Sequence, residues 1–199
     1  MKKLGFKYKV HEIKKYKIND IKLKNNSINI INIINTDFKF KKTFDKISNK
    51  SSKYIENSFK ISLDILKNNK VQGLINGPIS KKYFLNKKYL GITEYISKKL
   101  NVKKSAMLIY NKELSVCPIT THLPLKLVTK NINKKLIVEK VKIINEFYKT
   151  KFHFKPKIAV LGINPHCESI HNINEDEKIV KPTVNYLKKL KYRISGPYP

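Results

Sequence analysis

Two histidines in short, proline-containing turns are the side chains best placed to do chemistry. His122 lies in the run TTHLP at residues 120–124, and His166 lies in GINPH at residues 162–166. Each pattern predicts a buried strand that ends abruptly and presents an imidazole at its carboxyl end, where open α/β sheets bind ligands. A metal site or a catalytic site is therefore the leading hypothesis, although two histidines alone complete neither.

The other metal-binding residue types fit no motif. Cys117 and Cys167 share no CxxC spacing and offer no disulfide framework, which is typical of a reducing compartment. Cys167 directly follows His166, so it is either a thiolate ligand or a small residue in a turn, and the second interpretation is favoured. The remaining histidines, of which only His171 lies near His166 in sequence, are interpreted as surface residues: His11, His153 and His171.

Compartment and fold class follow from the apolar pattern. No apolar run reaches the roughly 20 residues that span a bilayer, and the first residues lack the apolar stretch of a signal peptide, so we expect a cytoplasmic protein that does not enter membranes. Strand-like and helix-like segments alternate, which predicts a three-layer α/β/α sandwich with a largely parallel sheet. Expected strands cover residues 28–34, 71–76, 105–110, 114–119 and 157–161. Expected helices cover residues 51–66, 136–148 and a segment that begins near Glu175 and is interrupted at Pro182.

The basic composition invites a nucleic-acid function, but its details weaken that hypothesis. The formal net charge is +29, yet of the 43 lysines and arginines only Arg193 is an arginine. Specific base recognition would be expected to use the two-pronged guanidinium of arginine. The lysines are also spread over nearly every segment. We therefore expect a lysine-rich solvated surface that attracts polyanions without specificity and no specific nucleic-acid partner.

Glycine-rich nucleotide loops are not part of the sequence. It contains neither GxGxxG nor GxxxxGK[ST], so it has neither a Rossmann fingerprint nor a P-loop. Any nucleotide must be held in another way.

Five ordered motifs carry a resemblance to a known family. The motifs GPISK, GITEY, TTHLPL, LGINPH and GPYP begin at residues 77, 91, 120, 161 and 196. In this order and spacing they resemble the 4-hydroxythreonine-4-phosphate dehydrogenases of pyridoxal phosphate biosynthesis. The resemblance covers residues 71–199, which we interpret as the α/β portion with the metal and substrate motifs, whereas residues 1–70 match loosely.

The resemblance implies a fold, a reaction and a set of site residues. The fold would be like that of isocitrate and isopropylmalate dehydrogenases, in a homodimer that binds NAD outside any GxGxxG loop. Family members oxidise the secondary alcohol of a phosphorylated amino acid, with a divalent cation such as Zn, Mg or Co held by three histidines. His122 and His166 correspond to two of these ligands, and Thr93 corresponds to a substrate contact. The resemblance identifies no catalytic residue, and Lys81 lies either near the substrate phosphate or on the solvated surface.

Departures from the family pattern limit these expectations. Ile92 replaces a histidine of the substrate site and can neither donate a hydrogen bond to a phosphate nor carry charge. The family's first-strand loop is missing, and the third metal histidine, which family members carry in a His-Asp-Gln-Gly motif contributed by the partner subunit, would follow GPYP. We therefore expect a truncated, internal portion of the enzyme with impaired activity alone, for which a separate C-terminal polypeptide is a candidate partner. The alternatives are a related dehydrogenase of a four-carbon phosphorylated sugar acid and a non-catalytic, lysine-rich polyanion-binding remnant.

One geometric expectation tests the metal hypothesis directly. If both histidines bind the same cation, His122 and His166 face each other across the carboxyl edge of the sheet. Their nitrogen atoms should then lie about 3 to 4 Å apart, as ligands of one ion with bonds near 2.1 Å do.

Overall fold

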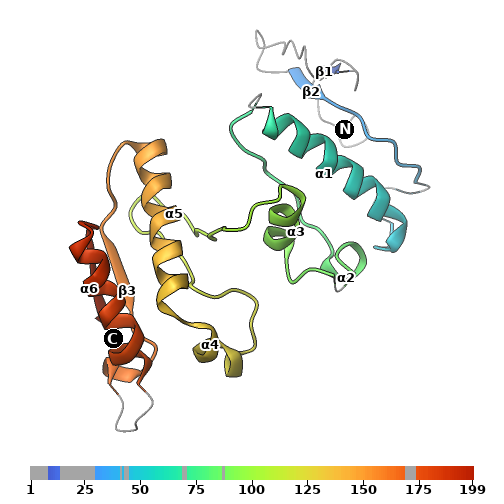
Figure 1. The fold of residues 1–199 in the computed structure, drawn as a ribbon. Helices are drawn as coiled ribbons and strands as arrows, with labels where there is room; N and C mark the ends of the chain where they lie inside the picture. Colours follow the sequence, from blue (N-terminus) through green and yellow to red (C-terminus); the bar gives the residue numbers. More distant parts are fainter. Residues whose placement is uncertain are drawn as a thin grey trace. The chain divides into compact units, whose positions relative to one another are not determined.

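The structure is a computed structural model that describes residues 9–13, 30–40, 42, 45–68, 71–86, 88–168 and 174–199. The chain forms two compact units, Met1–Tyr89 and Leu90–Pro199. Figure 1 traces the elements of each unit. No helix within the described ranges is long and apolar enough to cross a membrane.

The described part of the first unit contains two short strands and two helices. The elements are β1 (Lys9–Glu12), β2 (Ile30–Ile33), a 3-10 turn η3 (Asn49–Ser51), α1 (Ser52–Lys67) and α2 (Lys81–Phe84). β1 and β2 pair in parallel, with Lys9 opposite Ile30. α1 forms because apolar side chains repeat at helical spacing, and it buries Phe59 and Leu63, one turn apart. The ring of Phe59 stacks on Phe84 at 5.8 Å between centroids, which joins α1 to α2.

The second unit holds both candidate histidines. Its α-helices are α3 (Ile92–Lys99), α4 (Leu125–Asn131), α5 (Lys134–Phe152) and α6 (Lys181–Lys189). A 3-10 turn η4 (Pro165–Cys167), a short π-helix η5 (Asp176–Val180) and the strands β3 (Ile158–Leu161) and β4 (Ile194–Tyr198) complete the described part of the unit. The Asn133 side chain caps α5 by accepting a hydrogen bond from the Leu136 N–H at 2.9 Å. In Figure 1, β3 and α6 lie side by side next to α5.

One apolar core holds α5, α6 and β4 together. Its buried members are Ile132, Ile137, Val141, Val180, Val184, Leu187 and Ile194. Complete burial of such a side chain stabilises the fold by about 1.5–3 kcal/mol. The core fixes the strand that leads into the His166 turn, because Ile158 and Val160 of β3 pack against it.

The parallel pair β3 and β4 contains a local irregularity that requires glycine. Ile158 lies opposite Ile194, and the register shifts between Ala159 and Leu161. Gly196 has a φ of +121° there, and a Cβ at this position would collide with the Val160 carbonyl oxygen. Only glycine tolerates both conditions without strain.

The long amphipathic helices confirm the sequence predictions, whereas several short strands do not. The helices at 51–66 and 136–148 and the strand at 157–161 are confirmed with small changes of bounds. The strand at 28–34 is confirmed over Ile30–Ile33, and residues 28 and 29 lie outside the described residues. The helix expected near Glu175 is also confirmed, since η5 gives way to α6 at Lys181, next to Pro182. The described part of the chain is thus a mixed α/β structure with small parallel sheets.

Three strand predictions are wrong. Residues 71–76 form no strand, and Ile75 is 98% exposed, so this apolar run has no core to pack against. Residues 105–110 and 114–119 meet only at one isolated antiparallel bridge between Ile109 and Val116. His122 therefore does not follow a strand, in contrast to His166. No strand was expected at β4, whose GPY segment was considered only as part of a family motif.

Candidate functional site

His122 lies directly against a carboxylate from α3. Its Nδ1 atom is 3.3 Å from Oε1 of Glu94, and the Thr121 hydroxyl donates to the same oxygen at 3.4 Å. Both the His122 and the Glu94 side chains are 32% exposed. His122 itself has a φ of 57°, in the left-handed region. A tight turn therefore presents the imidazole to a fixed acceptor while part of the ring stays open to solvent.

Gly91 makes room for this contact. A Cβ at Gly91 would lie 2.7 Å from Cε1 of His122 and 2.7 Å from Oε2 of Glu94. The φ of Gly91 is −159°, which any residue adopts, so glycine is needed here for space and not for backbone freedom. The sequence motif that begins at Gly91 thus provides both the acceptor and the space for the ring.

Glu94 is an acceptor at neutral pH. Partial burial alone would raise the pKa of its carboxyl group. Hydrogen bonds from its own backbone N–H, from His122 and from Thr121, together with the charge of His122, outweigh that effect and hold the pKa below its usual value. The carboxylate form is the one that accepts a hydrogen bond from an imidazole N–H.

His166 is positioned by a buried carboxylate that acts on the backbone. Asp176, in the first turn of η5, is completely buried. Its carboxylate accepts from the N–H groups of Ile163 at 2.9 Å and Asn164 at 2.8 Å, and from the Asn164 side-chain amide at 3.0 Å. These bonds fix the turn between β3 and His166. His166 is exposed and has a φ of 57°.

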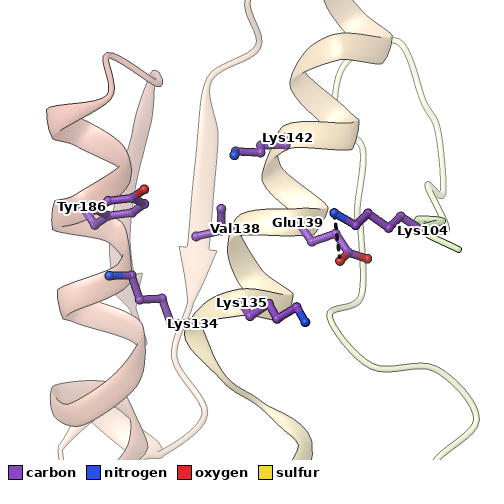
Figure 2. A pocket seen from close by; sticks show the side chains of 7 residues that line it. All are labelled: Lys104, Lys134, Lys135, Val138, Glu139, Lys142 and Tyr186. Atoms are coloured by element: carbon purple, nitrogen blue, oxygen red, sulfur yellow. Dashed lines mark ion pairs between the residues drawn. The ribbon is translucent and has the colours of Figure 1, made fainter.

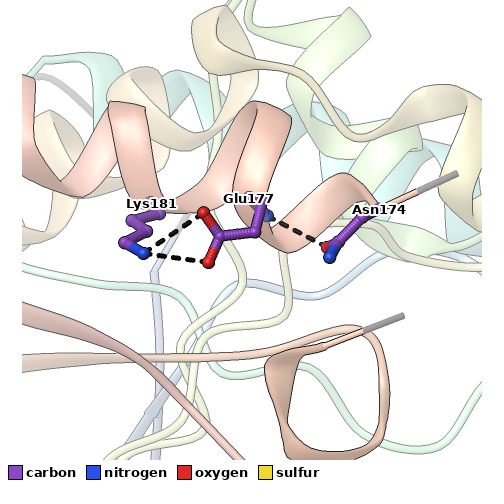
Figure 3. A network of polar contacts seen from close by, with 3 residues as sticks. All are labelled: Asn174, Glu177 and Lys181. Atoms are coloured by element: carbon purple, nitrogen blue, oxygen red, sulfur yellow. Dashed lines mark hydrogen bonds and ion pairs between the residues drawn. The ribbon is translucent and has the colours of Figure 1, made fainter. Parts of the chain in front are cut away.

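The start of η5, which carries Asp176, is itself fixed by polar contacts. The Asn174 side chain accepts from the Glu177 N–H at 3.1 Å, as a helix cap does. One turn on, Lys181 donates to both carboxylate oxygens of Glu177, at 2.9 and 3.2 Å (Figure 3). The cap fixes the start of this helix, whereas the exposed Glu177–Lys181 pair contributes little net stability.

Cys167 is a packing residue in the same turn. It is 9% exposed, and a Cβ at Gly162 would lie 2.5 Å from its Sγ atom. Burial raises the pKa of the Cys167 thiol, and the nearby Asp176 and Glu168 carboxylates raise it further. A neutral, tightly packed thiol favours the interpretation as a small residue in a turn over the interpretation as a thiolate ligand.

The other residues singled out in the sequence lie in different surroundings. Ile92 and Thr93 occupy the first turn of α3, both half-buried and close in sequence to Glu94. Lys81 begins α2 in the first unit. His153 ends α5 with a φ of 60°, which makes it a left-handed helix cap. His171 lies outside the described residues.

The structure adds two residues that sequence reasoning did not assign. Glu94 contacts His122, which lies 28 residues later in the sequence. Asp176 contacts Ile163 and Asn164 in the His166 turn, which lie 13 and 12 residues earlier. Glu94 lies within the GITEY motif, and Asp176 lies in the acidic run at residues 175–177, where only the start of a helix was predicted. Among the described residues, no three His, Cys, Asp or Glu side chains converge on a point where they could hold a metal ion.

A second candidate is a lysine-lined groove of about 440 Å³ in the same unit. Its lining residues are Lys104, Lys134, Lys135, Val138, Glu139, Lys142 and Tyr186. The Lys134 ammonium lies 4.1 Å from the centre of the Tyr186 ring, and Lys104 pairs with Glu139 at 4.0 Å. Figure 2 shows Lys135 and Lys142 pointing in opposite directions. The ammonium groups do not converge, so the groove is not built as an anion site.

A double substitution tests this interpretation of the groove. We expect Lys135→Ala with Lys142→Ala to weaken binding of a single-stranded oligonucleotide no more than Lys98→Ala with Lys130→Ala does. Each pair removes the same charge, and binding that is only electrostatic depends on the number of charges. Filter binding at two salt concentrations measures this. A much larger loss for the groove pair alone would establish a localised anion site.

Comparisons with known proteins define the family. Residues 2–199 match the sequence model of the family described as "Pyridoxal phosphate biosynthetic protein PdxA". A protein of Sulfurihydrogenibium sp. named 4-hydroxythreonine-4-phosphate dehydrogenase is 38% identical over 197 residues, which cover 97% of this chain and 59% of that relative. An Aquifex aeolicus protein of the same name is 36% identical over 132 residues, covering 64% of this chain and 41% of that protein.

Solved structures agree with the sequence matches. A structure described as a putative 4-hydroxythreonine-4-phosphate dehydrogenase from Salmonella typhimurium superposes with a TM-score of 0.81 at 21% identity, covering 100% of this chain and 62% of that one. A Klebsiella pneumoniae structure named as the same enzyme gives 0.77 at 22% identity, covering 96% and 59%. The fold is therefore shared over this length. The chain belongs to the PdxA family and spans about 60% of the length of the first of these relatives.

Proposed function

We propose that this chain carries part of the site of a metal-assisted dehydrogenase that oxidises 4-phosphohydroxy-L-threonine with NAD in pyridoxal phosphate biosynthesis. Family membership supports the reaction. The observation that carries the site is that each candidate histidine is supported by a carboxylate, His122 by Glu94 on its ring and His166 by Asp176 through its turn. Metal-binding histidines typically donate their second ring N–H to a carboxylate, an arrangement that His122 has with Glu94.

The donor chemistry fits a divalent cation. We propose that His122 and His166 each supply one imidazole nitrogen and that a third ligand completes the set. Imidazoles suit Zn and Co better than Mg, which prefers oxygen ligands. When bound, the cation would polarise the substrate alcohol and stabilise the oxygen of the developing carbonyl. Thr93, beside Glu94 on α3, would contact the substrate.

The larger architecture belongs to the same proposal. The likeness to solved structures supports a three-layer, isocitrate-dehydrogenase-like sandwich, and family membership supports NAD and a homodimer. Because the sequence contains neither GxGxxG nor GxxxxGK[ST], other contacts would hold NAD. Residues 71–199 would carry the metal and substrate motifs.

Ile92 supports an alternative substrate. It is the half-buried first residue of α3, and its side chain offers only apolar contact where the resemblance implies a histidine. A four-carbon phosphorylated sugar acid is the second candidate substrate for this reason. Assays of a complete enzyme with both substrates would distinguish them, since the preferred substrate has the higher kcat/KM.

Single substitutions test the metal site. We expect His122→Ala and His166→Ala each to weaken Zn²⁺ binding. The loss of affinity should be at least about 10- to 100-fold, the loss typical when only a hydrogen-bond partner of a metal ligand is removed. Isothermal titration calorimetry measures the affinity. The double variant should lose little more than either single variant, because the two ligands serve one ion.

His153→Ala is the matched control for these variants. His153 is also exposed and also has a left-handed φ, of 60°, but we assign it to a helix cap. Its replacement should leave Zn²⁺ affinity unchanged. Equal effects of all three single substitutions, or independent additive losses at His122 and His166, would contradict a shared metal site.

A further inference from the structure

The Glu94 carboxylate contacts Nδ1 of His122, and this contact determines which of the two ring nitrogens is free to bind a ligand. Nδ1 of His122 lies 3.3 Å from Oε1 of Glu94. In a neutral imidazole one nitrogen carries the proton and the other carries the lone pair. A carboxylate beside Nδ1 accepts a hydrogen bond from an N–H there, which leaves the lone pair on Nε2.

We propose that Glu94 is a positioning residue that holds His122 in the Nδ1–H tautomer and turns its Nε2 atom toward the metal. The tautomer is inferred from the contact between Glu94 and Nδ1, whereas the role of Nε2 as a metal ligand rests on the proposed function. Glu94 touches neither metal nor substrate in this proposal and acts through the imidazole alone. A carboxylate bound to the far nitrogen also raises the basicity of a ligating imidazole.

Two further contacts restrict the ring and the carboxylate. A Cβ at Gly91 would lie 2.7 Å from Cε1 and 3.2 Å from Nδ1 of His122, so this edge of the ring packs closely against the backbone of Gly91. The Thr121 hydroxyl donates to Oε1 of Glu94 at 3.4 Å. The carboxylate is thus held by Thr121, the residue that precedes His122 in the turn, and the ring is held by both Glu94 and Gly91.

An ordinary surface ion pair would behave differently from a positioning contact. Glu94 and His122 are each one-third exposed, and pairs of such exposure contribute little net stability. Loss of Glu94 should therefore leave the thermal midpoint nearly unchanged. The tautomer of His122 would still change, because an exposed histidine without a partner at Nδ1 carries its proton mainly on Nε2.

The experiment observes the ring nitrogens by long-range ¹H–¹⁵N NMR of the chain labelled with ¹⁵N-histidine. At a pH where His122 is neutral, we expect mainly the Nδ1–H form in the wild type and mainly the Nε2–H form in Glu94→Ala. Glu94→Gln keeps an oxygen acceptor and should retain the Nδ1–H form. Glu177→Ala removes a carboxylate of the same unit that is paired to Lys181 instead, and it should leave the His122 spectrum unchanged.

Zn²⁺ titration of the same samples tests the link to metal binding. We expect Glu94→Ala to weaken Zn²⁺ binding about 10- to 100-fold, Glu94→Gln to weaken it less, and Glu177→Ala to leave it unchanged. An unchanged affinity in Glu94→Ala, where His122→Ala lowers it, would overturn the metal-directing role.

The outcomes separate this proposal from the proposed function. A wild-type His122 that is mainly Nε2–H would overturn the positioning role without any variant, so the test does not depend on the folding of Glu94→Ala. If His122→Ala leaves Zn²⁺ affinity unchanged, the proposed metal site fails, whereas the change of tautomer in Glu94→Ala would still establish that Glu94 positions the ring.

Discussion

Replacing Asp176 with alanine is expected to lower the free energy of unfolding by about 2–4 kcal/mol, because it leaves several polar groups of one turn without their acceptor. Asp176 is completely buried and accepts hydrogen bonds from two backbone N–H groups and one side-chain amide. Alanine removes this acceptor and leaves a small cavity beside Gly162. Urea unfolding followed by circular dichroism measures the loss.

The same substitution should also weaken the metal site. The turn that Asp176 fixes leads directly to His166, whose φ of 57° costs energy that the surroundings must offset. Once the turn loosens, His166 adopts other conformations, and we expect Zn²⁺ affinity to fall together with stability. This distinguishes Asp176 from Glu94, whose loss should change metal affinity with little effect on unfolding.

The adjacent residue provides the control. Glu177→Ala removes an acidic side chain from the same helical turn, but Glu177 is exposed and paired with Lys181, so its loss should cost no more than about 1 kcal/mol. If Asp176→Ala unfolds at the same urea concentration as Glu177→Ala, the turn does not depend on the buried carboxylate.

The sequence predicted the long helices because their stabilising contacts are periodic along the chain. Ile137 and Val141 repeat at helical spacing and are both buried in α5. A short apolar run does not show whether its residues are buried. Val71 and Ile75 are β-branched, as residues of a core strand often are, yet both are exposed. Whether such a run becomes a strand depends on a partner strand that its own residues do not specify.

The candidate site was likewise predictable from the sequence only in part. His122 and His166 could be found because proline, glycine and histidine mark unusual turns locally. Their carboxylate partners could not, because Glu94 and Asp176 reach them through contacts between distant segments. A left-handed histidine is not a sufficient signal either, since His153 has the same backbone conformation and ends a helix.

A polypeptide of residues 1–199 is expected to reduce NAD far more slowly than the roughly 1 per second of an ordinary enzyme. The proposed site needs three metal ligands, and only His122 and His166 correspond to them here. Among the described residues, no three His, Cys, Asp or Glu side chains are placed so that they could hold a metal ion. An incompletely held cation positions the substrate poorly and stabilises the developing charge poorly, and each effect is worth several kcal/mol of activation barrier.

Spectrophotometric detection of NADH formation with 4-phosphohydroxy-L-threonine and Zn²⁺ or Co²⁺ measures this rate. The Sulfurihydrogenibium relative, of which this chain covers 59%, serves as the positive control under the same conditions. Adding a polypeptide that supplies the remaining segment of that relative should raise the rate, and His166→Ala in this chain should abolish the gain because it removes a ligand from the assembled site. Turnover near 1 per second by residues 1–199 alone would contradict this prediction. It would show that His122 and His166, together with neighbouring residues of this chain, suffice to hold the metal for catalysis.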